Sequence, residues 1–468
     1  MSSLLKRLYE PSHMISPDKV VGEIPSAKSM YKETLRMAWP SMTESFLVAM
    51  VSIVDTIMVS SLGTYAIAAV GITNQPRFIV LALFMALNTG IVAVVARRRG
   101  QNDPEGANRA LRQCLLIGSV LSVILTVIAI FFARPLLLFA GAQQDTIDPA
   151  VTYFRIMLVG VPATVISLCI NAAQRGAGNT KISMRTNITA NLVNCLLNYL
   201  LIQGNLGFPA WGIAGAAIAT AFGNYVAMFM SIYSVIRKGK FLHLTLNESY
   251  LPDKETMSSI LKITSSSALE QVFIRIGFFV YVMIVANLGT NEYATHQICM
   301  NVLTLSFCFG DGMTVAASAL VGQNLGRKRP DLSVLYCKCT QRVGICVSTI
   351  LTIIFVVFAK PILTLFSSDP YILDLGSNIM VYVAFIVVGQ IAQVIYSGCL
   401  RGAGDTMFTA VSSMISIALI RPILSYVLCY PLGFGIYGAW WGVLIDQYLR
   451  LVLNGWRFST GKWTKIVV

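Results

Sequence analysis

Carboxylate and amide side chains recur at helical spacing within stretches that are otherwise apolar. Glu44 and Asp55 are eleven residues apart, which is about three turns of a helix, so both fall on one face. Four asparagines follow one another at spacings of four, three and four, which places them in a single stripe along a second helix. They are Asn187, Asn191, Asn194 and Asn198.

The outer end of that stripe is predicted to form an ion-binding layer. Asn194 and Asn198 fall at a depth similar to Asp55, and Thr220 reaches the same level from a third helix. Carboxylate, amide and hydroxyl oxygens suit a proton or a hard cation such as sodium. We therefore expect these four residues to couple the protein to an ion, with Glu44 as a further candidate. The alternative is that the asparagines only hydrogen-bond neighbouring helices.

A second group of charged residues lies in the later part of the chain, again within apolar stretches. Charges in such positions are costly and usually have a function. Two acids and three arginines indicate a paired, buried network, for which a structural role and a role in gating or proton relay are both open. They are Glu270, Arg275, Arg421, Asp446 and Arg450.

The elements that must position these residues are transmembrane helices. Of the 468 residues, 56% are hydrophobic and 12% are charged, against about 25% charged in an ordinary soluble domain. Runs such as Cys114–Phe132 are long enough to cross a bilayer, and backbone in lipid must be helical. We predict an all-α polytopic membrane protein with twelve transmembrane helices. They lie at 37–61, 68–96, 107–133, 148–173, 182–203, 212–237, 257–287, 294–321, 334–359, 371–399, 407–428 and 437–457.

The formal net charge of +14 does not indicate nucleic-acid binding, because Lys and Arg concentrate in alternate loops. Loops such as 97–112 and 327–342 are rich in them, whereas 61–65 and 287–293 have none. By the positive-inside rule both termini are cytoplasmic, which agrees with an even number of spans. We expect a multi-pass protein of a bacterial cytoplasmic (inner) membrane. The ten cysteines have no spacing typical of a disulfide framework or a metal site, so no metal is expected.

The chain contains two copies of one six-helix unit. Leu62-Gly63-Thr64 recurs as Leu288-Gly289-Thr290, and the Arg-Gly-Ala-Gly at Arg175 recurs at Arg401 with the same offset (288 − 62 = 401 − 175 = 226). Each copy crosses an even number of times, so the two lobes should be related by a pseudo-two-fold axis along the membrane normal, with a substrate path between them. The predicted division is a cytoplasmic N-terminal segment (1–36), a first lobe (37–237), a cytoplasmic linker (238–256), a second lobe (257–459) and a cytoplasmic tail (460–468).

The second copy does not keep the asparagine stripe. The positions that match the four asparagines are largely apolar, which indicates that the scaffold does not need the stripe and favours a functional role for it. These positions are Ser413, Ile417, Ile420 and Leu424.

Motifs of soluble enzymes are missing from the sequence. It has no phosphate-binding Gly-Lys-Ser/Thr loop, no HExxH and no Gly-x-Ser-x-Gly elbow. We therefore expect a protein that is not an enzyme, without catalytic residues and without a cofactor other than a coupling ion, H⁺ or Na⁺. In the absence of a nucleotide-binding motif, transport must be driven by an ion gradient or by the substrate itself.

The motifs together resemble those of the multidrug and toxic compound extrusion (MATE) family, and of its DinF-like branch in particular. The resemblance spans roughly 36–457 and implies a V-shaped antiporter of twelve helices that exchanges cytoplasmic organic compounds, often cationic, for external sodium ions or protons. The motifs are WP…E…VDT…SLGT from Trp39 to Thr64, ALEQ at 268–271, HQI at 296–298, VGQNLG at 321–326, and RGAGNT and RGAGDT from Arg175 and Arg401.

The resemblance also implies roles for single residues. The cation site of the DinF-like branch falls on Asp55, Asn194 and Thr220. The proline at which helix 1 of that branch bends falls on Pro40.

Two departures from the family pattern bear on the coupling ion. The second carboxylate of the DinF-like site is Asn198 in this chain, and the two acids of the NorM-like sodium site fall on Ile274 and Gln390. A single carboxylate among amides suits a proton better, although a sodium ion held by carbonyl oxygens stays open.

The expected function is the export of organic, cationic or amphipathic compounds in exchange for protons or sodium ions by alternating access. One alternative is a lipid-linked oligosaccharide flippase of the same superfamily, which should have a strongly cationic cavity. Another, of a different class, is a membrane-embedded enzyme or receptor. The expected partners are a small organic substrate and membrane lipid, with no nucleic acid, and the chain is expected to act as a monomer.

Overall fold

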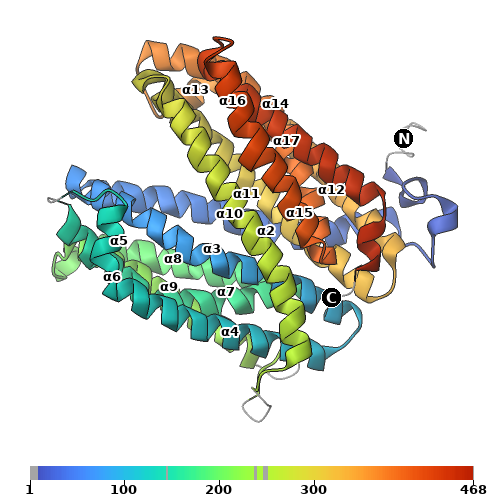
Figure 1. Cartoon of the computed structure of the whole chain (residues 1–468). Coiled ribbons are helices and arrows are strands. Elements are labelled where there is room, and N and C mark those ends of the chain that lie inside the picture. Colours follow the sequence, from blue (N-terminus) through green and yellow to red (C-terminus); the bar gives the residue numbers. More distant parts are fainter. Residues whose placement is uncertain (1–8, 144–145, 237–239, 246–250, 467–468) are drawn as a thin grey trace. The chain divides into compact units, whose positions relative to one another are not determined.

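The computed structural model describes residues 9–143, 146–236, 240–245 and 251–466, and this part of the chain is helical, without a strand (Figure 1). Parts of the predicted N-terminal segment (1–8), linker (238–239 and 246–250) and tail (467–468) lie outside the described residues. The longer helices are α2 (Ala27–Ser60), α3 (Thr64–Gly100), α4 (Pro104–Phe131), α6 (Ile147–Val159), α7 (Val161–Gly176), α8 (Thr180–Leu201), α9 (Gly212–Ile236), α10 (Lys254–Ala286), α11 (Thr290–Gly326), α12 (Pro330–Val357), α14 (Pro370–Ala403) and α17 (Gly435–Ser459). The shorter ones are α5 (Ala133–Phe139), α13 (Ala359–Thr364), α15 (Thr406–Ser413), the π-helical η4 (Met414–Ile420) and α16 (Arg421–Cys429), with 3₁₀ turns at Pro11–His13, Pro17–Lys19, Asn205–Gly207 and Lys462–Lys465.

Every predicted span has a helical counterpart. Among the described residues nine helices are long and apolar enough to cross a membrane, and α6 with α7, bent by 42°, adds a tenth. Two further helices, α8 with 22 residues and α17 with 25, are long enough to cross a membrane at 1.5 Å per residue, but they are more polar than the others. Those two helices carry the asparagine stripe and Asp446, so their polarity is that of the candidate functional residues.

The chain divides into two compact units. We call residues 43–264 the N-unit, and residues 1–42 with 265–468 the C-unit. The borders between the units fall inside α2 and α10, whereas the predicted limits of the two lobes were placed at loops. The predicted lobe and linker limits stay a prediction.

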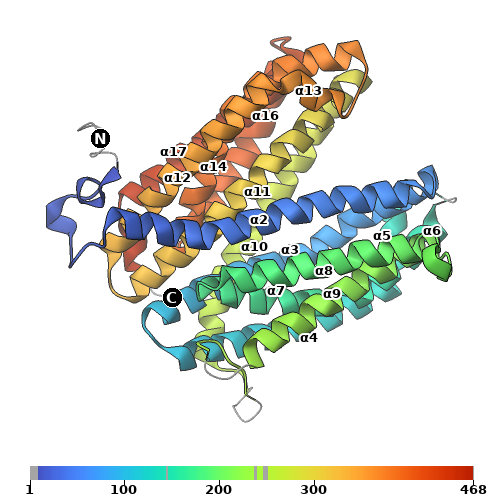
Figure 2. The same ribbon diagram turned by 180° about the vertical axis from the view of Figure 1, so that it is seen from behind.

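Within the N-unit, α8 and α9 lie side by side (Figure 2). Gly223 of α9 makes this close approach possible, because a Cβ there would lie 3.0 Å from the carbonyl oxygen of Ala190 and 3.2 Å from Cβ of Asn194. The approach also brings Thr220, one turn earlier on α9, next to Asn194. A small residue in α9 therefore sets the spacing of the candidate site.

Within the C-unit, the helix that matches α8 is not wound uniformly. Residues Met414–Ile420 form a π-helical segment, and the N–H of Arg421 donates to the carbonyl of Ser416, five residues earlier. Pro422 follows directly and has no N–H to donate, so a normal helical hydrogen bond is lost at this point. Such π turns are rare and often lie near a functional site.

The stretch before α2 is tied to the start of α12, also within the C-unit. The N–H of Val21 donates to Asp331 Oδ2 at 3.2 Å, and the guanidinium of Arg329 donates to the carbonyl of Glu23 at 2.9 Å. Arg329 and Asp331 form an ion pair of 2.8 Å. This carboxylate therefore holds the N-terminal segment in place.

Candidate ion-coupling site

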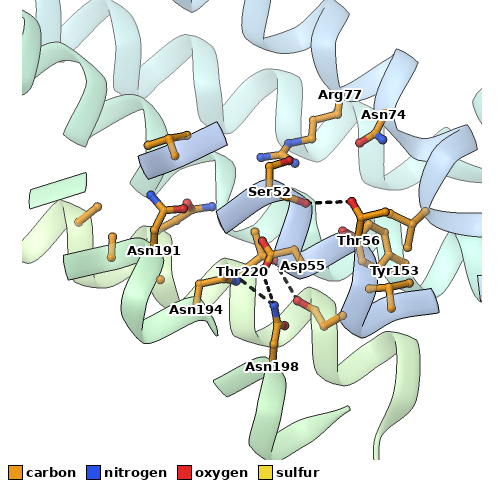
Figure 3. A pocket seen from close by; sticks show the side chains of 18 of the residues that line it. Ser52, Asp55, Thr56, Asn74, Arg77, Tyr153, Asn191, Asn194, Asn198 and Thr220 are labelled. Carbon is orange, nitrogen blue, oxygen red and sulfur yellow. Dashed lines mark hydrogen bonds between the residues drawn. The ribbon is translucent and has the colours of Figure 1, made fainter. Parts of the chain in front are cut away.

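Asp55 is the centre of a polar cluster in the N-unit (Figure 3). It lies on α2, five residues before the last residue of that helix, and its side chain is half-buried. The amide nitrogen of Asn198 donates to Asp55 Oδ1 at 2.8 Å. The carboxylate of α2 is therefore joined directly to the asparagine stripe of α8.

Asn194 links Asp55 to the third helix. When the Asn194 side chain is oriented with its amide nitrogen towards Asp55, that nitrogen lies 3.0 Å from one carboxylate oxygen and 3.1 Å from the other. Its amide oxygen then accepts from the Thr220 hydroxyl at 3.1 Å. The reverse orientation would place the amide oxygen against an ionised carboxylate, so the hydrogen-bond network selects the first. The structure thus places Asp55, Asn194, Asn198 and Thr220 in one cluster, while their role in ion coupling stays a prediction.

The cluster lines a cavity of about 400 Å³ within the N-unit. Its walls come from α2, α3, α6, α8 and α9, and the whole asparagine stripe borders it. Six polar lining residues were missed by the sequence reasoning: Ser52, Thr56, Asn74, Arg77, Tyr153 and Asn224. Arg77 could have been found, because it is a charge inside the predicted span 68–96.

Arg77 is the cation of this cavity. No hydrogen bond or ion pair joins its guanidinium to another residue in the described part of the chain. In Figure 3 Arg77 and Asn74 lie apart from the cluster of Asn194, Asn198 and Thr220. Tyr153 of α6 lines the same cavity. The cavity thus holds one acid and one base that do not pair with each other.

Glu44, the second predicted acid of helix 1, lies at the inner end of the stripe. Its Oε1 accepts from Asn187 at 2.5 Å and from Ser183 at 3.2 Å, and the Arg175 guanidinium lies at 3.5 Å. Both acids of α2 therefore face α8, as their spacing predicted. Pro40 is inside α2, one turn before Glu44; the bend predicted at this proline stays a prediction.

Glu270 occupies the same environment in the C-unit. It accepts from Arg401 at 3.0 Å, from the Thr409 hydroxyl at 3.1 Å and from the Ser413 hydroxyl at 3.3 Å. Each of these partners matches a partner of Glu44 at the constant offset of the repeat. The two glutamates are therefore equivalent members of the repeat.

Asp446 forms a separate cluster with two arginines. It is completely buried and accepts from Arg421 and, at 3.1 Å, from Arg450. Arg275, on α10, has an exposed side chain. The network predicted from Glu270, Arg275, Arg421 and Asp446 is thus divided in the structure, because Glu270 and Asp446 bind different arginines. The sequence reasoning missed Arg401 as the partner of Glu270.

Metal coordination finds no support among the described residues, which contain no group of three or more His, Cys, Asp or Glu side chains that could hold a metal ion. The identity of the coupling ion stays a prediction.

Comparison with known proteins identifies the family of this chain. The sequence model of the MatE family matches residues 40–200 and again residues 266–427. The chain belongs to the MatE family. The starts of its two matched stretches are separated by the same offset as the motifs, so the family's own repeat coincides with the internal repeat of the sequence. The resemblance drawn from the motifs is confirmed.

Two relatives and one solved structure cover nearly the whole chain. The "Probable multidrug resistance protein NorM" of Thermotoga maritima is 27% identical over 453 residues, 95% of each chain. The "Uncharacterized transporter YisQ" of Bacillus subtilis is 25% identical over 429 residues, 91% of this chain and 94% of YisQ. A multidrug resistance MATE family transporter of the MOP superfamily, solved in an outward-facing conformation, has a TM-score of 0.87 at 22% identity, over 92% of this chain and 97% of that one. The last likeness confirms the predicted all-α, two-lobed fold.

Proposed function

We propose that the protein is a secondary active antiporter that exports organic compounds in exchange for protons by alternating access. The observation that carries the proposal is Asp55, a carboxylate inside a cavity of a membrane protein, bound by amides of α8. The name of the NorM relative supports a multidrug substrate range. The protein acts in this proposal as a transporter and not as an enzyme.

The cluster around Asp55 can serve two charge states. When Asp55 is ionised, Asn194 and Asn198 donate to it. When Asp55 is protonated it must donate one hydrogen bond, and an amide that turns over about its last side-chain bond offers its oxygen as the acceptor. Thr220 can follow this change, because a hydroxyl both donates and accepts. Rotation of one amide therefore supplies the acceptor that a protonated Asp55 needs.

Proton uptake and substrate export are coupled because a proton and the positively charged substrate compete for Asp55. An ionised Asp55 attracts a positively charged group of the substrate, and protonation removes that attraction in a cavity where charge interactions are poorly screened. External protons then release the substrate outside. We propose a proton rather than sodium because the cluster holds a single carboxylate, with Asn198 at the second position.

The proposal includes a location and an orientation. We infer a multi-pass protein of a bacterial inner membrane, with both termini in the cytoplasm, that works as a monomer in contact with membrane lipid. The alternation of basic loops supports the orientation. The flippase alternative is not favoured in the N-unit, because its cavity has one arginine balanced by one aspartate.

The test is transport in proteoliposomes with an imposed proton or sodium gradient. Asp55→Asn mimics the protonated state, so this variant should insert and fold but lose gradient-driven export, and its rate should no longer depend on pH. Arg134→Gln, on the exposed pair of Arg134 with Asp148, is the control and should transport at the wild-type rate. Gradient-driven export at the wild-type rate in Asp55→Asn would refute the assignment.

A further inference from the structure

The cavity of the N-unit contains more than the Asp55 cluster. Arg77 comes from α3 and has neither a hydrogen bond nor an ion pair within the described ranges. An unpaired charge inside a transmembrane cavity is expensive and marks a substrate or ion pathway. The guanidinium therefore lines a cavity in which a ligand can supply its counter-charge.

The acid and the base of the cavity are held apart. Asp55 lies five residues before the turn between α2 and α3, and Arg77 lies thirteen residues after the start of α3. At 1.5 Å per residue these positions are about 8 and 20 Å from the ends of their helices, so Arg77 is about 12 Å deeper. One molecule has to be extended to reach both.

The fold itself does not need a base at this position. The residue that matches Arg77 in the C-unit is Leu303, which is 1% exposed and belongs to the hydrophobic core. The same scaffold position therefore packs well with an apolar side chain. Arg77 is an addition specific to the unit that has the cavity.

We propose that Arg77 selects the substrate, and that the preferred compounds are zwitterionic: an organic cation that also carries a carboxylate or similar acid. The acid binds Arg77, since guanidinium matches a carboxylate with two parallel hydrogen bonds, and the positive group lies near Asp55. Apolar wall residues such as Val48, Val59 and Val70 contact the body between them. The proposal rests on the proposed transport function and narrows the expected substrates from organic cations in general to zwitterions.

This charge arrangement also explains release. With Asp55 ionised, the cavity is neutral overall and matches a neutral zwitterion. Once Asp55 is protonated, the cavity carries the net positive charge of Arg77, which repels the positive end of the substrate. Arg77 thus strengthens binding before proton uptake and opposes the cationic end of the substrate after it.

The experiment compares two dyes that differ in one group. Rhodamine B carries a cationic ring system and a free carboxylate, and its ethyl ester carries the cation alone. Binding to purified protein is followed by fluorescence anisotropy, and export is measured in proteoliposomes. Arg77→Gln should weaken rhodamine B binding at least tenfold and leave the ester unchanged or better bound, while Arg77→Lys should keep part of the preference.

A control variant and three contradicting results complete the experiment. Arg134→Gln makes the same chemical change outside the cavity and should leave both dyes unaffected. Equal loss of both dyes in Arg77→Gln, or no loss of either, would overturn the assignment. A wild-type protein that binds rhodamine B through Arg77 but transports neither dye under any gradient would instead refute the proposed antiport and leave the binding site standing.

Discussion

In each unit the residues that match the candidate site form two layers along the helices. The two units share the inner layer and differ in the outer one. In the inner layer, Glu44 with Arg175 in the N-unit has its counterpart in Glu270 with Arg401 in the C-unit, down to the hydroxyl or amide partners. In the outer layer Asp55 corresponds to Tyr281, which is completely buried in the C-unit core.

The outer layer of the C-unit is filled where that of the N-unit is hollow. The positions of Arg77 and Tyr153, which border the cavity, are taken by Leu303 and Ile379, both in the hydrophobic core. We infer that the paired layer found in both copies belongs to the scaffold, and that the cavity layer of the N-unit carries the transport function proposed above. The predictions below test this inference.

The largest expected effect concerns Asp446, whose match in the N-unit is Thr220. Asp446→Asn leaves Arg421 and Arg450 buried without a counter-charge, which should lower the free energy of unfolding by about 3–5 kcal/mol. Thermal unfolding in detergent measures this loss. Thr220→Val, at the matched position, should cost far less, and adding Arg450→Gln to Asp446→Asn should restore part of the stability. Unchanged stability with lost transport would identify Asp446 as a coupling residue.

The inner layer gives a matched pair of variants. Glu44→Gln and Glu270→Gln each remove one buried carboxylate from an arginine, and each should lower the free energy of unfolding by about 1–3 kcal/mol while proton-driven export continues. The measurement combines thermal unfolding with transport in proteoliposomes. If Glu44→Gln abolishes coupling and Glu270→Gln does not, the inner layer of the N-unit is more than scaffold.

Asn198→Asp tests why the N-unit favours a proton. A second carboxylate beside Asp55 adds a hard oxygen ligand, so sodium should drive export with an affinity raised about tenfold, or about 1.4 kcal/mol. Initial rates of export against sodium concentration give the affinity. Leu424→Asp, at the aligned position of the C-unit, is the control and should confer no sodium dependence. A sodium response that is equal in wild type and Asn198→Asp would contradict the single-carboxylate argument.

The smallest effect concerns the start of α12 in the C-unit and the matching start of α4 in the N-unit. Asp331 binds the N-terminal segment through Val21, whereas its match Glu105 is exposed. Asp331→Asn should weaken that attachment by about 1 kcal/mol. Faster tryptic cleavage at Lys19 would report the loosening, and Glu105→Gln should leave the cleavage rate unchanged. Equal rates in wild type and Asp331→Asn would show that other contacts hold the segment.

Much of this arrangement could be predicted because it follows from local rules. Hydropathy placed the helices, a constant offset gave the repeat, and helical spacing put Glu44 and Asp55 on the face that meets α8. The ion partners were harder, since pairing depends on packing between helices. Arg401 lies just beyond the predicted span 371–399 and looked like a loop residue, although it reaches back to Glu270. Arg77 was present in a predicted span but was not weighed.

The π segment of Met414–Ile420 changes the direction of the side chains that follow it, relative to the aligned residues of α8. A hydrogen-bonded turn of π-helix contains one residue more than a turn of α-helix. The side chains that follow are therefore rotated about the helix axis by roughly 100° relative to a regular α-helix. Cys195 of α8 is half-buried, while Arg421 at the aligned position is 2% exposed and binds Asp446. A local change of winding therefore alters which side chains are buried, and from Met414 to the end of α16 at Cys429 the alignment of the two halves matches positions in the chain but not directions in space.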